Sequence, residues 1–107
     1  MTEVDRVQKW LEDLRTTLGD AALLVSRGKR AFDTDPALPL AFEALCNRVG
    51  DLAKKLVDAN PDQFSEIIWS QAARNRDFVV HHYHRVDTDA LWNTVAISFP
   101  ELAKLIG

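Results

Sequence analysis

The sequence contains one cysteine, Cys46, and this scarcity excludes two common ways of holding a small protein together. A single thiol can form neither an internal disulfide nor a cysteine-rich zinc site. Phe42, Leu45 and Val49 surround it at helical spacing, so we expect Cys46 to pack as a small apolar side chain on a buried helix face. The absence of disulfides is typical of a reducing compartment, and we therefore expect a cytoplasmic protein.

Long apolar runs, strand patterns and an excess of positive charge are also missing. No stretch approaches the roughly 18 apolar residues that span a membrane, and charged residues throughout the N-terminal segment argue against a secretory leader. No segment alternates apolar and polar residues as a half-buried strand does. The formal net charge of -3 disfavours a broad nucleic-acid-binding surface, so any such contact should be local.

The residues that are present predict one all-helical domain over residues 1–107. Hydrophobic residues make up 47% of the chain and charged residues 27%, which is an ordinary balance for a folded domain. Apolar residues recur at three- and four-residue steps through 3–26, which predicts a long helix capped by Thr2 and ended by Gly28. Turn-forming residues predict a loop over 29–39.

The rest of the chain continues the helical pattern. A second long helix is predicted for 39–59, because Asn60-Pro61 stops it. Asp87 is expected to cap a later helix, with Val86 and Leu91 in contact across the cap. The other expected elements are a short turn or helix at 64–69, a third main helix at 70–85, a helix from 87 to about 98 and a final helical turn at 100–107. Together they predict an antiparallel bundle of four to five helices.

A cluster of cationic and titratable residues lies on the third main helix. All three histidines lie between positions 81 and 84, and Arg74, Arg76 and Arg85 flank them. Histidine exchanges a proton near neutral pH, and arginine offers a permanent charge and a fork of donors that matches phosphate. These residue types together suit chemistry at a phosphodiester.

Helical spacing indicates how this cluster is arranged. At about 100° per residue, Arg76 and Tyr83 are nearly aligned two turns apart, and Asp77 lies one turn from His81. Arg76 and His81 lie on flanking sides of one broad face, so a second copy of the helix would help to close a cleft between them. From the residues alone, two other interpretations stay open: a solvated charged face, or a metal site formed by Asp77, His81 and His84.

The run Arg76-Asp77-x-x-x-His81-x-Tyr83 resembles the HepT-like toxins of the HEPN superfamily, whose motif is Arg, four residues, His, one residue and Tyr. Asp77 fits the small polar residue that follows the arginine in that family, and Asp51 stands where the family usually has Glu. The flanking features that also match are Asn60-Pro61, Ile68-Trp69, Val86-Asp87, Leu91-Trp92-x-x-Val95 and Phe99-Pro100.

The resemblance implies a homodimeric helical bundle in which two motifs face one cleft and cleave RNA without a metal or other cofactor. It implies His81 as general acid or base, Arg76 as the group that stabilises transition-state charge, and Asp77 as the residue that orients them. Arg74 is a helper of Arg76 or its rival, and Asp51 a weaker supporting acid.

The resemblance also implies a partner, a minimal nucleotidyltransferase antitoxin that silences the toxin by adding AMP to Tyr83. The alternative is a non-catalytic member of the family, a helical dimer that assembles with a nucleotidyltransferase and cleaves nothing.

Overall fold

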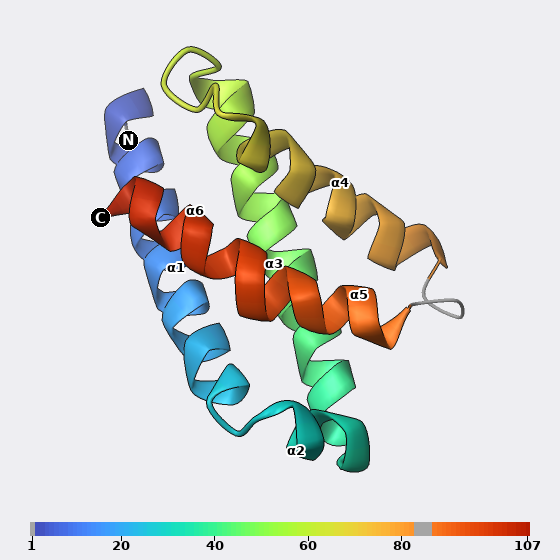
Figure 1. Ribbon diagram of the computed structural model, residues 1–107. Coiled ribbons are helices and arrows are strands. Elements are labelled where there is room, and N and C mark those ends of the chain that lie inside the picture. The colour runs from blue at the N-terminus through green and yellow to red at the C-terminus, as the bar shows by residue number, and fades with distance from the viewer. Residues whose placement is uncertain (1, 83–86) are drawn as a thin grey trace.

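Helices account for all regular secondary structure in the part of the chain that the structure describes. The computed structural model describes residues 2–82 and 87–107, and for residues 75–82 it describes the backbone (Figure 1). The elements are α1 (Glu3–Val25), α2 (Lys29–Thr34), α3 (Ala37–Ala59), α4 (Ile67–His82), α5 (Thr88–Asn93), the π-helical turn η2 (Thr94–Ser98) and α6 (Phe99–Ile106). The predicted all-α fold is therefore confirmed.

The start of α1 is held by a reciprocal cap. The Asp5 backbone N–H donates to the Thr2 hydroxyl at 3.2 Å, and the Thr2 N–H donates to the Asp5 carboxylate at 3.3 Å. The helix ends at Val25, and Gly28 follows with a φ of 92°, a conformation that costs glycine little and other residues much. The predicted cap Thr2 is confirmed, whereas the C-cap of α1 is Ser26, and Gly28 is the N-cap of α2.

The segment predicted as a loop over 29–39 is largely helical, so that prediction was wrong. Lys29 and Asp33 pair across one turn of α2, and Phe32 is buried with its ring 4.8 Å from that of Phe42. This tertiary burial outweighs the local turn signals. Pro39 lies in the first turn of α3, where its missing N–H would have no helical partner.

The third main helix begins earlier than predicted. The predicted turn at 64–69 ends in helix, because α4 starts at Ile67 rather than at residue 70. Trp69 lies in its first turn and is 2% exposed, with its ring 4.9 Å from that of Phe64 in an edge-on contact. The predicted end of α3 at Asn60 is confirmed, whereas the predicted end of the third helix near residue 85 lies outside the described residues.

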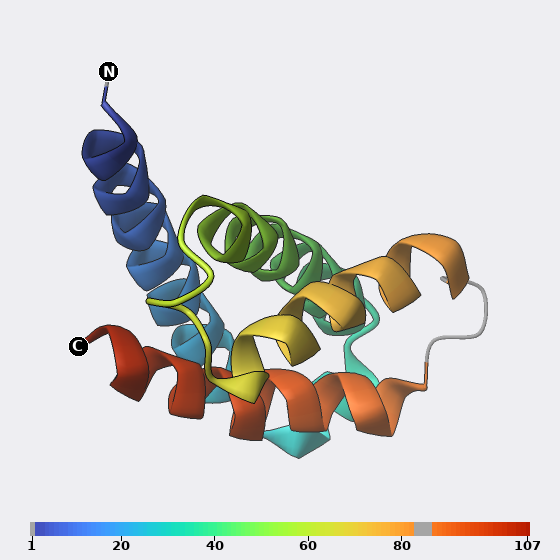
Figure 2. The same cartoon turned by 90° about the horizontal axis from the view of Figure 1, so that it is seen from above.

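The last three elements form one rod that crosses α1 and α3 (Figures 1 and 2). Asp87 caps α5 as predicted, and its contact partner Val86 lies outside the described residues. Pro100 has no N–H to donate, and the turn before it widens to a π-helix in which the Phe99 N–H reaches the Thr94 carbonyl. Arg15 of α1 donates to the Ile106 carbonyl at 2.9 Å and holds the end of the rod.

The helices share one hydrophobic core, to which each of α1, α3, α4 and the α5–α6 rod contributes. Neighbouring long helices run antiparallel: α1 against α3, and α3 against α4 (Figure 1). Among residues 2–82 and 87–107, no helix is both long and apolar enough to cross a lipid bilayer.

Candidate active site

The helix α4 carries the predicted catalytic residues on one continuous backbone. Arg76, Asp77 and His81 all lie within Ile67–His82, so the helical spacing assumed for them holds. His81 follows Arg76 by five positions, with four residues between them, which corresponds to about 7.5 Å along the helix axis. Tyr83, the predicted modification site, lies outside the described residues.

The exposure of the side chains in the first half of α4 shows which side of the helix faces the core. Trp69 and Ala72 are buried against the core, and Arg74 is exposed. At about 100° per residue, position 76 lies about 40° from that of Ala72, and position 81 lies about 20° from that of Arg74. Positions 76 and 81 therefore belong to different sides of α4, and position 81 shares its side with Arg74.

The start of α4 is fixed by a small aromatic cluster. The indole N–H of Trp69 donates to the Glu66 carboxylate at 3.2 Å, and the indole ring packs edge-on against Phe64. Because a buried indole N–H needs a partner, this hydrogen bond lets Trp69 be almost completely buried without an unpaired donor. The direction in which α4 projects toward residue 76 follows from this anchor.

A second cluster fixes the chain just beyond the motif. The Asp87 carboxylate accepts from the backbone N–H groups of Asp89 and Ala90 at 2.9 and 3.2 Å. One turn later, the Trp92 ring stacks on Phe42 with centroids 5.8 Å apart and tilts against Phe32 at 5.3 Å. We call residues 76–83 the motif segment. Along the chain it lies between two residues that are held by packing, Trp69 in α4 and Trp92 in α5, and we call these the two anchors.

Lys29 ties α2 to the beginning of α5. Its ammonium group lies 2.6 Å from Asp33 and 3.4 Å from Asp89. The hydrogen bond to Asp33, followed by the contact with Asp89, raises the pKa of Lys29 above its ordinary value. The contact stays solvent-accessible, so it aligns the two elements more than it stabilises them.

The two supporting residues that the sequence suggested lie on neighbouring helices. Asp51 is exposed on α3, next to the buried Gly50, and Arg74 is exposed on α4. Arg48, one turn before Asp51, contacts α1. Its Nε donates to the buried Thr17 hydroxyl at 2.8 Å, and this hydrogen bond links α3 to α1.

Within the described side chains, the one thiol is buried and no metal site is present. Cys46 is buried as predicted, and desolvation raises the pKa of its thiol to about 12, so the thiolate is scarce at neutral pH. No group of three His, Cys, Asp or Glu side chains in this part of the chain could hold a metal ion. The alternative ligands Asp77, His81 and His84 lie outside the described side chains.

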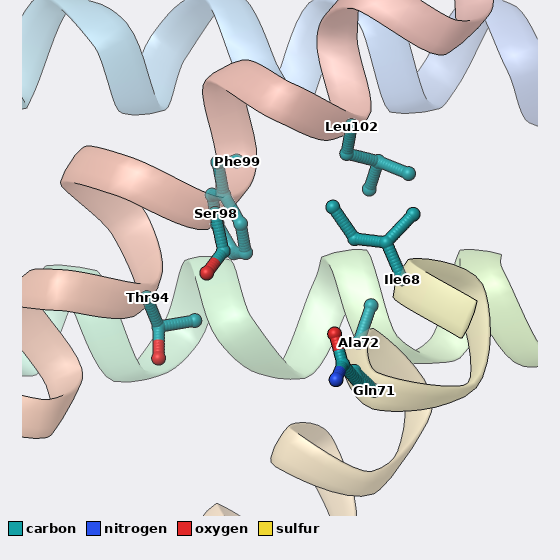
Figure 3. Close-up of a pocket in the computed structure, with 7 residues that line it drawn as sticks. All are labelled: Ile68, Gln71, Ala72, Thr94, Ser98, Phe99 and Leu102. Carbon is teal, nitrogen blue, oxygen red and sulfur yellow. The ribbon is translucent and has the colours of Figure 1, made fainter. Parts of the chain in front are cut away.

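The structure also contains a groove that the sequence did not indicate. It lies between α4 and the η2–α6 segment and has a volume of about 310 Å³ (Figure 3). We call it the α4–η2 groove, and its lining residues are Ile68, Gln71, Ala72, Thr94, Ser98, Phe99 and Leu102. Helical periodicity carries no signal for such a site, because its two walls come from segments that are distant in sequence.

A family model described as Ribonuclease HepT-like matches residues 11–107 of this chain, a range that includes both anchors and the whole motif between them. The chain belongs to this family. The predicted family and the predicted enzyme class, a ribonuclease, are thereby confirmed.

Two curated relatives carry provisional ribonuclease names. One is named as an RNase and comes from Caldanaerobacter subterraneus subsp. tengcongensis. It is 29% identical over an alignment of 97 residues, and the match covers 87% of each chain. The other, a probable ribonuclease HepT from Thermococcus cleftensis, is 35% identical over 54 residues, about half of each chain. No solved structure matches this HepT-like chain significantly.

Proposed function

We propose that this HepT-like domain, residues 1–107, is a toxin that cleaves cytoplasmic RNA without a metal ion, with Arg76 and His81 as its catalytic residues. The observation that carries the proposal is the family match across residues 11–107, a range in which Arg76, Asp77 and His81 lie on the one helix α4. Histidine and arginine on one helix supply the two requirements of phosphodiester cleavage, a movable proton and a fixed positive charge.

In the proposed reaction, His81 accepts the proton of a ribose 2′-hydroxyl while that oxygen attacks the adjacent phosphorus. The bond from phosphorus to the 5′-oxygen breaks, and a protonated histidine returns a proton to this leaving oxygen. The products are a 2′,3′-cyclic phosphate and a 5′-hydroxyl. Arg76 stabilises the charge that builds on the phosphoryl oxygens, and Asp77 positions His81 through a hydrogen bond across one helical turn.

A homodimer would bring position 76 and position 81 to the same cleft, which a single α4 helix does not do. Positions 76 and 81 differ by about 140° around α4, so one copy presents them on flanking sides. Two α4 helices facing each other across a two-fold axis would bring position 81 of one copy toward position 76 of the other. The second copy would also contribute the second histidine that a paired acid and base require.

Arg74 is the alternative to Arg76 as the arginine that stabilises charge in the transition state, and the positions of the two residues on α4 distinguish them. It is exposed on the same side of α4 as position 81, whereas position 76 follows the buried Ala72 by one turn. We propose Arg76 as the catalytic residue because it keeps the motif spacing, and Arg74 as an RNA-phosphate contact beside His81, with Asp51 in a supporting role.

The catalytic assignment is tested by measuring RNA cleavage, in the presence of a chelator, by the parent and by His81→Ala, Arg76→Ala and Arg74→Ala. His81→Ala and Arg76→Ala should each reduce the rate at least about a hundredfold, the range associated with losing an acid–base or charge-stabilising group. Arg74→Ala should weaken RNA binding and leave the turnover rate nearly unchanged.

Gln8→Ala, an exposed change on α1, is the matched control and should behave as the parent does. Equal cleavage by His81→Ala and the parent would refute the catalytic assignment. If no variant and no parent sample cleaves RNA, the non-catalytic assembly role is the better description. Activity that disappears with the chelator would support the metal site instead.

We further propose that a minimal nucleotidyltransferase antitoxin silences the toxin at Tyr83. The phenol oxygen would attack the α-phosphorus of ATP, pyrophosphate would leave, and the phenolic proton would pass to solvent. The added AMP would place a bulky anion beside the motif and repel RNA. Incubation with the antitoxin and ATP should raise the intact mass by one AMP in the parent and by nothing in Tyr83→Phe; a gain in both variants would refute Tyr83 as the acceptor.

A further inference from the structure

The α4–η2 groove has a chemical character that differs from the rest of the proposed site. We propose that it binds a nucleobase of the RNA next to the cleaved bond, an assignment that rests on the proposed ribonuclease function. The groove has polar side chains on both walls, and apolar side chains gather toward the end formed by Ile68 and Leu102 (Figure 3). Its lining includes no Lys or Arg, so it is unsuited to a phosphate and suited to the uncharged part of a nucleotide.

Polar groups that could read a base edge are available in the groove. Gln71 is exposed and Ser98 half-buried, and neither side chain has a hydrogen-bond partner in the part of the chain that the structure describes. The Thr94 hydroxyl donates to the Ala90 carbonyl at 2.9 Å and keeps its capacity to accept. A glutamine amide can donate and accept side by side, which is the pattern needed to pair with a base edge.

Among the apolar residues of the groove, the half-buried Ile68 has surface left for the flat face of a base, and the others close the groove beneath it. Phe99 and Leu102 are 5% and 1% exposed and lie in the rod, and Ile68 and Ala72 face them from α4 (Figure 3). A volume of about 310 Å³ is at the lower end of the range of small-molecule sites. The groove therefore suits one base with its sugar rather than a larger ligand.

The π-helical turn explains why this polar wall exists. Thr94 and Ser98 bound η2, where the Phe99 N–H reaches back five residues because Pro100 cannot continue the ordinary ladder. Such turns are frequent at functional sites, since they redirect side chains without ending the helix. Val95, which is 1% exposed, packs the same turn into the core, and this packing positions the side chains of Thr94 and Ser98.

The groove lies close enough to the motif to receive a neighbouring base. Gln71 precedes Arg76 by five residues and His81 by ten, which corresponds to about 7.5 and 15 Å along the helix axis. In Figure 3, Gln71 and Thr94 lie at one end of the groove and Ile68 and Leu102 at the other. Since α4 continues from Gln71 toward the motif, the polar end is the nearer one.

The first test is the base preference of cleavage. The full-length protein is given RNA with randomised bases around the cut, and the cut ends are sequenced for the parent, Gln71→Ala, Gln71→Glu and Ser98→Ala. The parent should prefer one base at one flanking position, by about fivefold, as expected for one or two hydrogen bonds. Gln71→Ala should abolish this preference, Gln71→Glu should change the preferred base, and Ser98→Ala should weaken it.

Gln8→Ala, the same change on an exposed α1 residue, should keep the parent's preference. Equal melting temperatures for all variants show that each is folded. An unchanged preference in both Gln71 variants overturns the proposal, and so does a parent with no preference at any flanking position.

A second test separates this proposal from the proposed function. Adenosine, guanosine, cytidine and uridine, which carry no phosphate, are titrated into the parent while the side-chain amide signals of Gln71 are followed by NMR; their loss in Gln71→Ala identifies them. At least one nucleoside should shift these signals without shifting those of Gln8, and ribose 5-phosphate should shift neither. No shift with any nucleoside overturns the groove assignment even if RNA is cleaved. Nucleoside binding by a protein that cleaves no RNA overturns its role in cleavage and refutes the proposed function.

Discussion

Trp69 in α4 and Trp92 in α5 stand on either side of the motif segment, and they are held by different kinds of contact. Trp69 is 2% exposed, and its one polar atom donates to Glu66 at 3.2 Å. Trp92 is only half-buried and belongs to a three-ring cluster with Phe32 and Phe42. The upstream anchor is therefore a core residue, whereas the downstream anchor is a surface-facing stack supported by a helix cap and an ion pair.

The difference predicts that changes at the two anchors have different consequences. Burial of Trp69 sets where α4 starts and how it is turned, because a large side chain in the core has one position available. The contacts around α5 are individually modest, so each can be lost at small cost. Changes upstream should then act mainly on stability, and changes downstream mainly on the geometry of the site.

The largest effect is expected from Trp69→Ala. Removing this side chain leaves a cavity in the core and an unpaired Glu66 carboxylate, and should lower the free energy of unfolding by about 3–5 kcal/mol. Chemical denaturation measures the loss. Trp69→Phe keeps most of the apolar ring and should recover more than half of it; a Trp69→Ala protein as stable as the parent would show that burial is not what fixes α4.

A smaller effect is expected from Trp92→Ala. The half-buried ring has less area to lose and its neighbours can partly cover the gap, so the free energy of unfolding should fall by about 1–3 kcal/mol. RNA cleavage measured well below the melting temperature should fall more than it does in Trp69→Phe. If Trp92→Ala destabilises the protein as much as Trp69→Ala does, the two anchors are equivalent and the comparison fails.

The smallest effect on stability is expected from Asp87→Ala, which removes a helix cap worth about 1 kcal/mol. Asp35→Ala is the matched control, because the Asp35 carboxylate accepts from the Ala37 N–H at 3.0 Å at the start of α3, far along the chain from the motif. Thermal melts should show similar losses for both. Cleavage should fall only for Asp87→Ala; equal cleavage by the two variants would mean that the α5 cap does not position the motif segment.

Local signals in the sequence were sufficient for several boundaries. Thr2 and Asp87 cap helices because their side chains reach N–H groups two or three residues away, and Asn60 ends α3 because proline follows it. Cys46 was placed correctly because its apolar neighbours recur at helical spacing. The helical spacing of Arg76 and His81 followed from the same periodicity.

Other features could not be read locally. Residues 29–34 contain turn formers, yet they form α2 because Phe32 packs against Phe42 in the next helix and against Trp92 in the distant α5. The early start of α4 depends on Trp69 meeting Phe64 and Glu66. For α2, the contact of Phe32 with Trp92 outweighed the local turn signals; for α4, the burial of Trp69 in the shared core favoured an earlier start.

The sequence by itself determined the helical class, the family and the order of the motif residues, because these depend on periodicity and on residue spacing along one segment. Only the tertiary structure decided which side of α4 is buried, where the motif is anchored and that a groove lies between α4 and η2. Gln71 and Thr94 line the same groove, and Trp92 packs against Phe32, although the members of each pair are far apart along the chain. Packing of the helices brings such residues together, and no local pattern encodes the register in which they meet.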